Sequence, residues 1–235
     1  MKEFSQLEKK LELRFKDKDL LKQAFVHRSY INENPNFKLS HNERLEFLGD
    51  AVLELVITEF LYKTYPNPEG ELTNWRASLV NGQMLAEVAG ELDLEKYLFL
   101  SKGETKDANS KARSYILANC FEALTGALYL DQGYKKSQKF ITKYLIPKLS
   151  NILSNQLYVD PKSKFQEVSQ EILGITPDYK VLGESGPDHN KVFEVGVYIK
   201  DELVAKAKGS SKQEAQVRAA ETALKLKGWS EKMST

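Results

Sequence analysis

Residues 42–50 read Asn-Glu-Arg-Leu-Glu-Phe-Leu-Gly-Asp, which places three carboxylates in a stretch that otherwise has the pattern of a core helix. Glu43, Glu46 and Asp50 are spaced i, i+3 and i+7, so a helix would hold them within roughly 60° of one another on one face. A row of like charges beside a core is costly unless a cation neutralises it. The stretch therefore predicts either a solvated helix face or a site for a hard, oxygen-preferring cation such as Mg²⁺.

The composition is that of a globular chain without strong charge bias. Its 235 residues are 41% hydrophobic and 10% aromatic, enough for one large domain or two smaller ones. The net charge of +1 means that any nucleic-acid surface must be local. The single cysteine excludes an internal disulfide, and the charged N-terminus is no signal peptide. The longest nearly uncharged run, residues 114–130, is too short for a membrane span. We therefore expect a cytoplasmic protein with no membrane partner.

The first 152 residues predict an all-helical domain, because apolar residues recur at helical spacing and no strand alternation is present. The turn signals of Pro, Gly and Asn divide this part into segments. The expected helices are 3–13, 17–29, 41–63, 72–90, 93–98, 113–130 and 134–149, with loops at 31–40, 64–70 and 101–110.

Residues 159–229 predict a second, smaller α+β domain with the order helix–strand–strand–strand–helix. Alternating apolar residues mark strands at 193–200 and 203–209, and a third strand is expected at 179–183. Asp201-Glu202 is the expected hairpin turn, and Ser210 or Ser211 the expected cap of the last helix. A helix through residues 165–173 precedes the strands.

A second acidic position lies in the apolar helix 113–130. Glu122 has apolar flanks on both sides, and Asn119 lies three residues before it on the same helical face. If this helix packs against the one that begins near residue 42, carboxylates and an amide oxygen surround one cavity. Such a set suits Mg²⁺ with retained waters, which serves phosphoryl chemistry. No Gly-rich phosphate loop is present, so phosphodiester hydrolysis is the reaction favoured. The neighbouring Cys120 reads as a small buried hydrophobe.

Residues 42–50 resemble the signature of bacterial ribonuclease III. The resemblance extends over the whole chain, including Glu-Gly-Glu-Leu-Thr at 69–73 and Ile-Leu-Ala-Asn-Cys-Phe-Glu-Ala-Leu at 116–124. It implies an all-helical endonuclease domain that forms a homodimer, with Phe47 at the interface. It further implies cleavage of both strands of double-stranded RNA to 5′-phosphate and 3′-hydroxyl ends. Ribosomal RNA precursors and structured messages are the implied substrates.

The resemblance also implies roles for individual residues. Glu46, Asp50, Asn119 and Glu122 stand at the positions of the Mg²⁺ ligands, with Mn²⁺ as a substitute metal. Asp50, Glu122 and Glu43 stand at the positions expected to act in catalysis.

One position departs from the family pattern, because Asn119 stands where the family most often has Asp. An amide oxygen still ligates Mg²⁺, but with one negative charge fewer. Three interpretations remain at this point: a tolerated natural variant of an active endoribonuclease, a substitution made to stall cleavage, or a natural non-cleaving protein of the same fold that binds double-stranded RNA.

The C-terminal module resembles the double-stranded-RNA-binding domain. Such a domain contacts two minor grooves and the phosphates between them, so it presents three separated contact regions. Here these are the first helix, the loop 186–189 and the start of the last helix, where Gln213 replaces a usual lysine. Binding is expected to be salt-sensitive and largely independent of RNA sequence. The expected contact residues are Gln166, Glu167, Gln170, His189, Ser211, Lys212 and Gln213.

Overall fold

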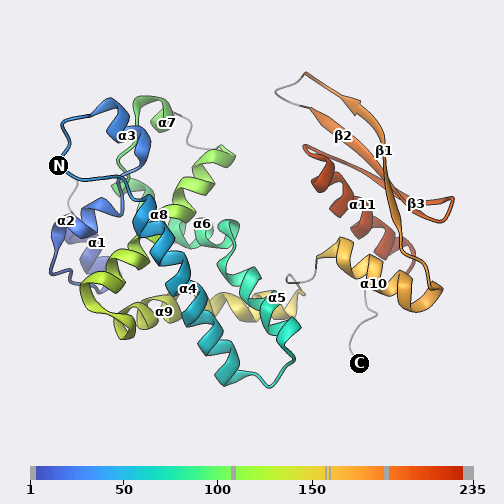
Figure 1. Ribbon diagram of the computed structural model, residues 1–235, viewed down its shortest axis with the longest axis horizontal. Coiled ribbons are helices and arrows are strands. Elements are labelled where there is room, and N and C mark those ends of the chain that lie inside the picture. Colours follow the sequence, from blue (N-terminus) through green and yellow to red (C-terminus); the bar gives the residue numbers. More distant parts are fainter. Residues whose placement is uncertain (1–3, 107–109, 157, 159, 188–190, 230–235) are drawn as a thin grey trace. The chain divides into compact units, whose positions relative to one another are not determined.

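The structure is a computed structural model that describes residues 4–106, 110–156, 158, 160–187 and 191–229. The chain forms two compact units, Met1–Tyr158 and Val159–Thr235, and each has its own hydrophobic core. The first unit is helical, and the second combines two helices with a sheet (Figure 1). Within the described ranges, no helix is long and apolar enough to cross a membrane.

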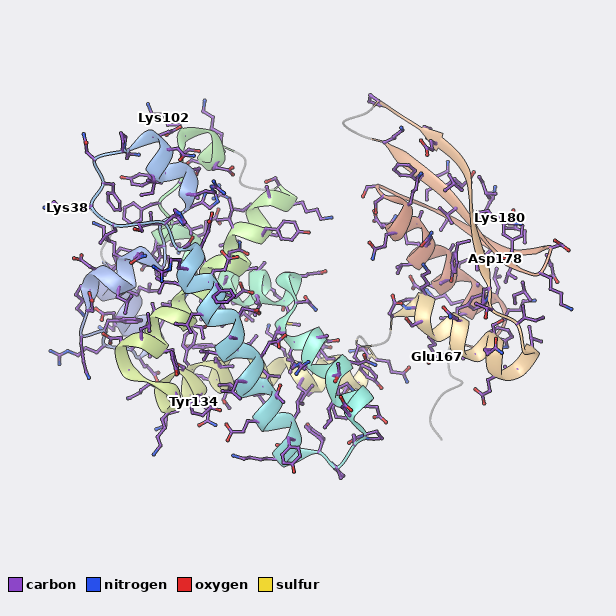
Figure 2. The ribbon with its side chains drawn as sticks, in the orientation of Figure 1. Lys38, Lys102, Tyr134, Glu167, Asp178 and Lys180 are labelled. Atoms are coloured by element: carbon purple, nitrogen blue, oxygen red, sulfur yellow. The ribbon has the colours of Figure 1, made fainter. Side chains whose placement is uncertain are left out.

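The first unit is built around the long helix α8, which packs against α4, α6 and α9. Eleven of its 22 residues are buried, so it is covered on most sides. Tyr134, which begins α9, donates a hydrogen bond to Glu59 of α4 and so ties these two helices together (Figure 2). The elements in chain order are α1 (Phe4–Leu11), α2 (Lys18–Gln23), α3 (Arg28–Glu33), α4 (Glu43–Thr64), α5 (Glu69–Val80), α6 (Gly82–Glu91), the short 3-10 helix η1 (Leu94–Tyr97), α7 (Lys102–Lys106), α8 (Lys111–Gln132) and α9 (Tyr134–Ser154).

Several predicted boundaries were wrong where capping side chains interrupt an apolar pattern. The expected helix 72–90 is two helices, because Asn81 takes an extended conformation and its side chain accepts a hydrogen bond from the Met84 amide. The expected helix 17–29 ends at Gln23. His27 caps a new helix, α3, which runs on into the predicted loop 31–40. A further short helix, α7, lies in the predicted loop 101–110.

Asn42 fixes where α4 begins. It is 4% exposed, and its backbone amide donates to the Val26 carbonyl at 2.9 Å. Its side-chain amide donates to the Ala24 carbonyl at 3.0 Å. The Asn42 carbonyl in turn accepts from the amides of Leu45 and Glu46. The first residue of the acidic stretch therefore anchors the helix to the segment between α2 and α3.

Helices α4 and α8 cross at two glycines. A Cβ atom on Gly49 would lie 1.8 Å from the Glu122 carbonyl oxygen, and one on Gly126 would lie 2.2 Å from the Leu45 carbonyl oxygen. Both distances are far shorter than a van der Waals contact, so the helices approach this closely only because neither position has a side chain. The crossing places the acidic residues of α4 next to those of α8.

The second unit is an antiparallel three-stranded sheet in the order β1-β2-β3, with α11 packed on β2 and β3 and α10 packed on α11. Inward-facing Val195 and Val197 are fully buried, as are the alanines at 219, 220 and 223 of α11. The hairpin turn falls at residues 200–201, one residue earlier than predicted, and Lys200 takes the left-handed φ of 54° there. The elements are α10 (Pro161–Leu173), β1 (Asp178–Ser185), β2 (Val192–Ile199), β3 (Glu202–Gly209) and α11 (Lys212–Leu226).

The glycine crossing leads to a stability prediction. Gly49→Ala should lower the free energy of unfolding of the first unit by at least about 2 kcal/mol, because the added methyl overlaps backbone that cannot move without separating the helices. Urea denaturation followed by helical circular dichroism measures the change. The matched control is Gly90→Ala on α6, where a Cβ meets nothing within 4 Å. That control should be neutral or stabilise by up to about 1 kcal/mol; equal effects of the two changes would contradict the close crossing.

Candidate active site

The structure brings together the four predicted metal ligands from two helices. Glu46 and Asp50 lie on α4, while Asn119 and Glu122 lie on α8. The Asn119 side chain is hydrogen-bonded to the Glu46 carboxylate, and the charges of Asp50 and Glu46 both act on Glu122. Residues more than 60 positions apart in the sequence therefore form one cluster at the crossing of α4 and α8, which we call the acidic pocket.

The pocket holds carboxylates under conditions that disfavour their ionisation. Burial, together with the nearby charges of Asp50 and Glu46, raises the pKa of Glu122 to about 8. Burial and then the charge of Glu43 raise the pKa of Glu46, and Asp50 adds to this, while the hydrogen bond from Asn119 opposes it. Without a cation, Glu122 therefore retains its proton near neutral pH.

Glu43 lies at the rim and is held by two basic residues that the sequence did not identify. The Arg28 Nη1 atom lies 3.4 Å from one of its carboxylate oxygens, and the His41 Nδ1 atom lies 3.7 Å from the other. The Glu43 and Arg28 side chains are 46% and 66% exposed, so both remain accessible to a ligand. No sequence spacing links position 28 to position 43, since Arg28 reaches Glu43 only through the packing of α3 beside the start of α4.

The chemistry of the pocket fits a hard divalent cation. Its donors are carboxylate and amide oxygens, the ligand type that Mg²⁺ prefers. In the part of the chain that the structure describes, no group of three or more His, Cys, Asp or Glu side chains is already arranged around one point as metal ligands. The fit therefore rests on the donor types and on the burial and mutual repulsion that raise the pKa values of Glu46 and Glu122.

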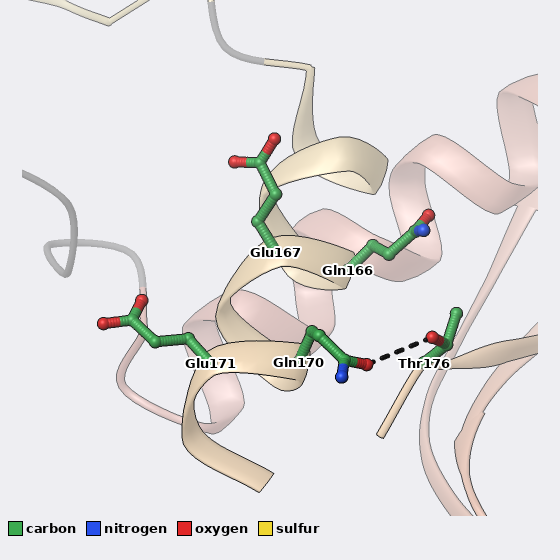
Figure 3. Close-up of a pocket in the computed structure, with 5 residues that line it drawn as sticks. All are labelled: Gln166, Glu167, Gln170, Glu171 and Thr176. Carbon is green, nitrogen blue, oxygen red and sulfur yellow. Dashed lines mark hydrogen bonds between the residues drawn. The ribbon is translucent and has the colours of Figure 1, made fainter. Parts of the chain in front are cut away.

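The expected RNA-contact residues of α10 lie together on an exposed face. Gln166, Glu167 and Gln170, with Glu171 and Thr176, line a hollow of about 470 Å³ (Figure 3). The Thr176 hydroxyl donates to the Gln170 side-chain oxygen at 3.2 Å, which orients that amide. Polar groups in a shallow hollow suit contacts with ribose hydroxyls and base edges.

The start of α11 forms a second exposed region. The Ser211 hydroxyl accepts a hydrogen bond from the Glu214 amide at 3.1 Å, and Ser211 is therefore the helix cap. Lys212 and Gln213 follow it and are exposed. The Lys212 Nζ lies 5.6 Å from the centre of the Phe193 ring. His189, the third expected contact, lies outside the described residues.

Comparison with known proteins matches both units to families. Residues 17–149 match a family described as ribonuclease-III-like, and residues 161–227 match the double-stranded RNA binding motif. A protein of Nitratiruptor sp. named Ribonuclease 3 is 46% identical over 227 residues, which cover 96% of this chain and 97% of that protein. A protein of Enterococcus faecalis with the same name is 42% identical and covers 94% of this chain and 96% of its own length.

Among solved structures, the nuclease domain of ribonuclease III from Campylobacter jejuni superposes with a TM-score of 0.54 at 37% identity. The match covers 61% of this chain and 99% of that domain, and that structure is described as having structural flexibility in a region involved in dimer formation.

A helical nuclease domain followed by a double-stranded RNA binding motif defines the class of endoribonucleases that act on double-stranded RNA. The two family models match the helical unit and the α+β unit in turn, and both relatives match nearly the whole chain. The chain belongs to the ribonuclease III family. The fold class and enzyme class predicted from the sequence are thereby confirmed.

The raised pKa of Glu122 predicts how stability depends on pH without metal. The pKa of this carboxyl is about 8 in the folded protein and about 4.5 in the unfolded chain, so the folded state binds the proton more tightly. The free energy of unfolding therefore falls as the pH rises from about 4.5 to about 8. Glu122→Gln should therefore be more stable than the natural chain by about 1–2 kcal/mol at pH 9, and about equal to it at pH 4. Urea denaturation in EDTA measures both. Glu54→Gln, on the exposed side of α4, is the control; a pH-independent difference for Glu122→Gln would contradict the prediction.

Proposed function

We propose that the acidic pocket of α4 and α8 hydrolyses double-stranded RNA with Mg²⁺ and leaves 5′-phosphate and 3′-hydroxyl ends. The observation that carries the proposal is the convergence of Glu46, Asp50 and Glu122 at the glycine crossing. Burial there, together with the charges of Asp50 and Glu46, raises the pKa of Glu122 to about 8. A pocket that retains protons for lack of a cation is suited to receive one.

The residues that would hold Mg²⁺ are Glu46, Asp50, Asn119 and Glu122. When bound, the ion would supply charge neutralisation for the phosphate and a lowered pKa for water. The protein contributes the arrangement of the ligands. Glu122 would hold the ion in its ionised form, and Asn119 orients the Glu46 carboxylate through their hydrogen bond.

We propose that Asp50 and Glu122 act on the reacting phosphodiester and that Glu43, whose charge acts on Glu46, supports the site from its edge. Because Glu43 is partly exposed and paired with Arg28, it supports the site by positioning a cationic side chain at the edge of the pocket. An arginine there can contact the RNA backbone, which carries one negative charge per nucleotide.

Asn119 determines the charge of the pocket. An aspartate at this position would add a fourth carboxylate beside Glu46, and so bind Mg²⁺ more tightly at the expense of metal-free stability. The amide keeps an oxygen for the ion and a donor for Glu46. We therefore propose an active enzyme with a moderate requirement for Mg²⁺.

Cleavage of a long RNA duplex across a Mg²⁺ titration tests this proposal. Asn119→Asp should lower the Mg²⁺ concentration for half-maximal cleavage about three- to tenfold, because it adds a charged ligand.

Glu122→Gln should lower the rate of cleavage at least about 100-fold while leaving duplex binding in EDTA unchanged. Glu87→Gln, on α6 and paired with Lys148, serves as the charge-matched control. If the natural chain binds duplex but never cuts it with Mg²⁺ or Mn²⁺, the non-cleaving alternative replaces the proposal.

The substrates that we propose are ribosomal RNA precursors and structured messages in the cytoplasm. The support is the family to which the chain belongs and the relatives named Ribonuclease 3 in bacteria. The single, buried Cys120 also suits a reducing compartment.

We further propose that the enzyme is a homodimer through the exposed face of α4. Phe47, Leu55 and Tyr62 lie on this face with 82%, 57% and 79% of their surface exposed. Their spacing of eight and seven residues keeps them on one side of the helix. Large apolar side chains in one row mark an interaction surface. The C. jejuni nuclease domain, whose description mentions dimer formation, supports a second copy of the chain as the partner.

Phe47→Ala tests the dimer. It should weaken self-association at least about tenfold, since a large aromatic side chain at an interface contributes strongly to affinity. Sedimentation velocity over a concentration series measures the change. Leu226→Ala removes a side chain that is 68% exposed on α11, and it should have no effect. Identical sedimentation of the Phe47 variant and the natural chain would contradict the assignment of this face.

A further inference from the structure

Three charged side chains from separate segments meet where the sheet of the second unit reaches the start of α11. The Glu184 carboxylate, near the end of β1, lies 3.1 Å from Lys191 Nζ and 3.5 Å from Lys212 Nζ. Lys191 immediately precedes β2, and Lys212 is the first residue of α11. The Glu184 side chain is 37% exposed and that of Lys212 is 58% exposed. The cluster is therefore open to a ligand.

The strand register explains why Glu184 reaches this helix end. Glu184 pairs with Phe193 of β2, and Phe193 pairs with Gly209 of β3, so the three stand in one row across the sheet. The Phe193 ring lies beneath Lys212. Gly209 abuts α11, because a Cβ there would lie 2.5 Å from the Ala215 nitrogen. The sheet therefore holds Glu184 and the start of α11 on the same side.

A second carboxylate at this end of the helix has a different task. Glu214 accepts hydrogen bonds from the Ser210 backbone amide and hydroxyl, and it pairs with Arg218 at 2.7 Å. The Glu214 carboxylate therefore stabilises the first turn of α11. Glu184 instead pairs with Lys191, which lies two residues after the expected RNA-contact loop 186–189, and with Lys212 at the start of α11.

We propose that Glu184 occupies, in the RNA-free protein, the place on Lys212 and Lys191 that a backbone phosphate takes when duplex RNA binds. A carboxylate and a phosphate compete for the same ammonium group, and a carboxylate that remains beside a phosphate repels it. Binding must therefore move Glu184 away from at least one lysine. Glu184 is thus a positioning residue that limits affinity for any duplex, whatever its sequence.

The salt dependence follows from the same competition. Each phosphate that a lysine neutralises releases counterions from the RNA. When the lysine arrives already neutralised by Glu184, the net charge gained by the complex is smaller, and so is the response to salt. Removing the carboxylate should therefore both strengthen binding and make it more sensitive to salt.

The experiment measures binding of the full-length chain to a short RNA duplex in EDTA by fluorescence polarisation. Glu184→Gln should bind about three- to tenfold more tightly at about 50 mM salt and lose this advantage at about 500 mM. In Mg²⁺ the same variant should lower KM for cleavage and leave kcat unchanged. Glu184→Asp keeps the charge and should bind as the natural chain does.

Two controls separate this role from a general charge effect. Glu221→Gln removes the same charge from α11, where Glu221 pairs with Lys225 at 2.6 Å, and it should change affinity less than about twofold. In the double variant Glu184→Gln/Lys212→Gln, the gain from Glu184→Gln should be smaller, because Lys212 is one of the two lysines that the variant frees.

Two results would overturn the proposal: Glu184→Gln binding no tighter than Glu221→Gln at low salt, or a gain that persists in full without Lys212. The inference rests on duplex binding by the second unit. Failure of that function is distinguishable, because the natural chain itself would then show no salt-sensitive binding to duplex RNA.

Discussion

The close crossing of α4 over α8 is the contact on which both the fold and the proposed site depend. At Gly49 and Gly126 the two backbones touch, and a methyl group at either position would overlap a carbonyl oxygen of the other helix. Helix α8 also packs against α6 and α9, so a displacement of α8 at this crossing would also disturb its packing against those two helices. The same two helices carry Glu46, Asp50, Asn119 and Glu122. A wider separation would therefore weaken the core and disperse the carboxylates at once.

The acidic pocket lowers the stability of the metal-free protein, and this property makes it receptive to a cation. Burial and mutual repulsion raise the pKa values of Glu46 and Glu122. A divalent ion would remove the repulsion and displace the retained proton, so part of its binding energy would come from relief of this strain. Asn119 moderates the effect, because its amide donates a hydrogen bond to Glu46 without adding charge.

The second unit has to attract a polyanion on a chain whose net charge is only +1. Its attraction for RNA therefore depends on a few lysines at the expected contact surface rather than on the net charge of the chain. The structure shows that these lysines are partly neutralised within the protein: Glu184 engages Lys191 and Lys212, and Glu194 lies 3.4 Å from Lys206. Polar groups on α10 add a second exposed region. This balance suits an enzyme that must bind duplexes of many sequences and release them.

The fold classes of the two units could be predicted from the chain alone, because helical spacing, strand alternation and a nine-residue signature are local patterns. The sequence did not determine the breaks at His27 and Asn81, where a side-chain cap outweighs a continuous apolar pattern. Only the tertiary structure decided that Glu46 and Asp50 face Glu122 across two glycines, that Arg28 pairs with Glu43, and that Glu184 reaches Lys212. These pairings join distant positions, and their charges act through distances and burial that no linear spacing encodes.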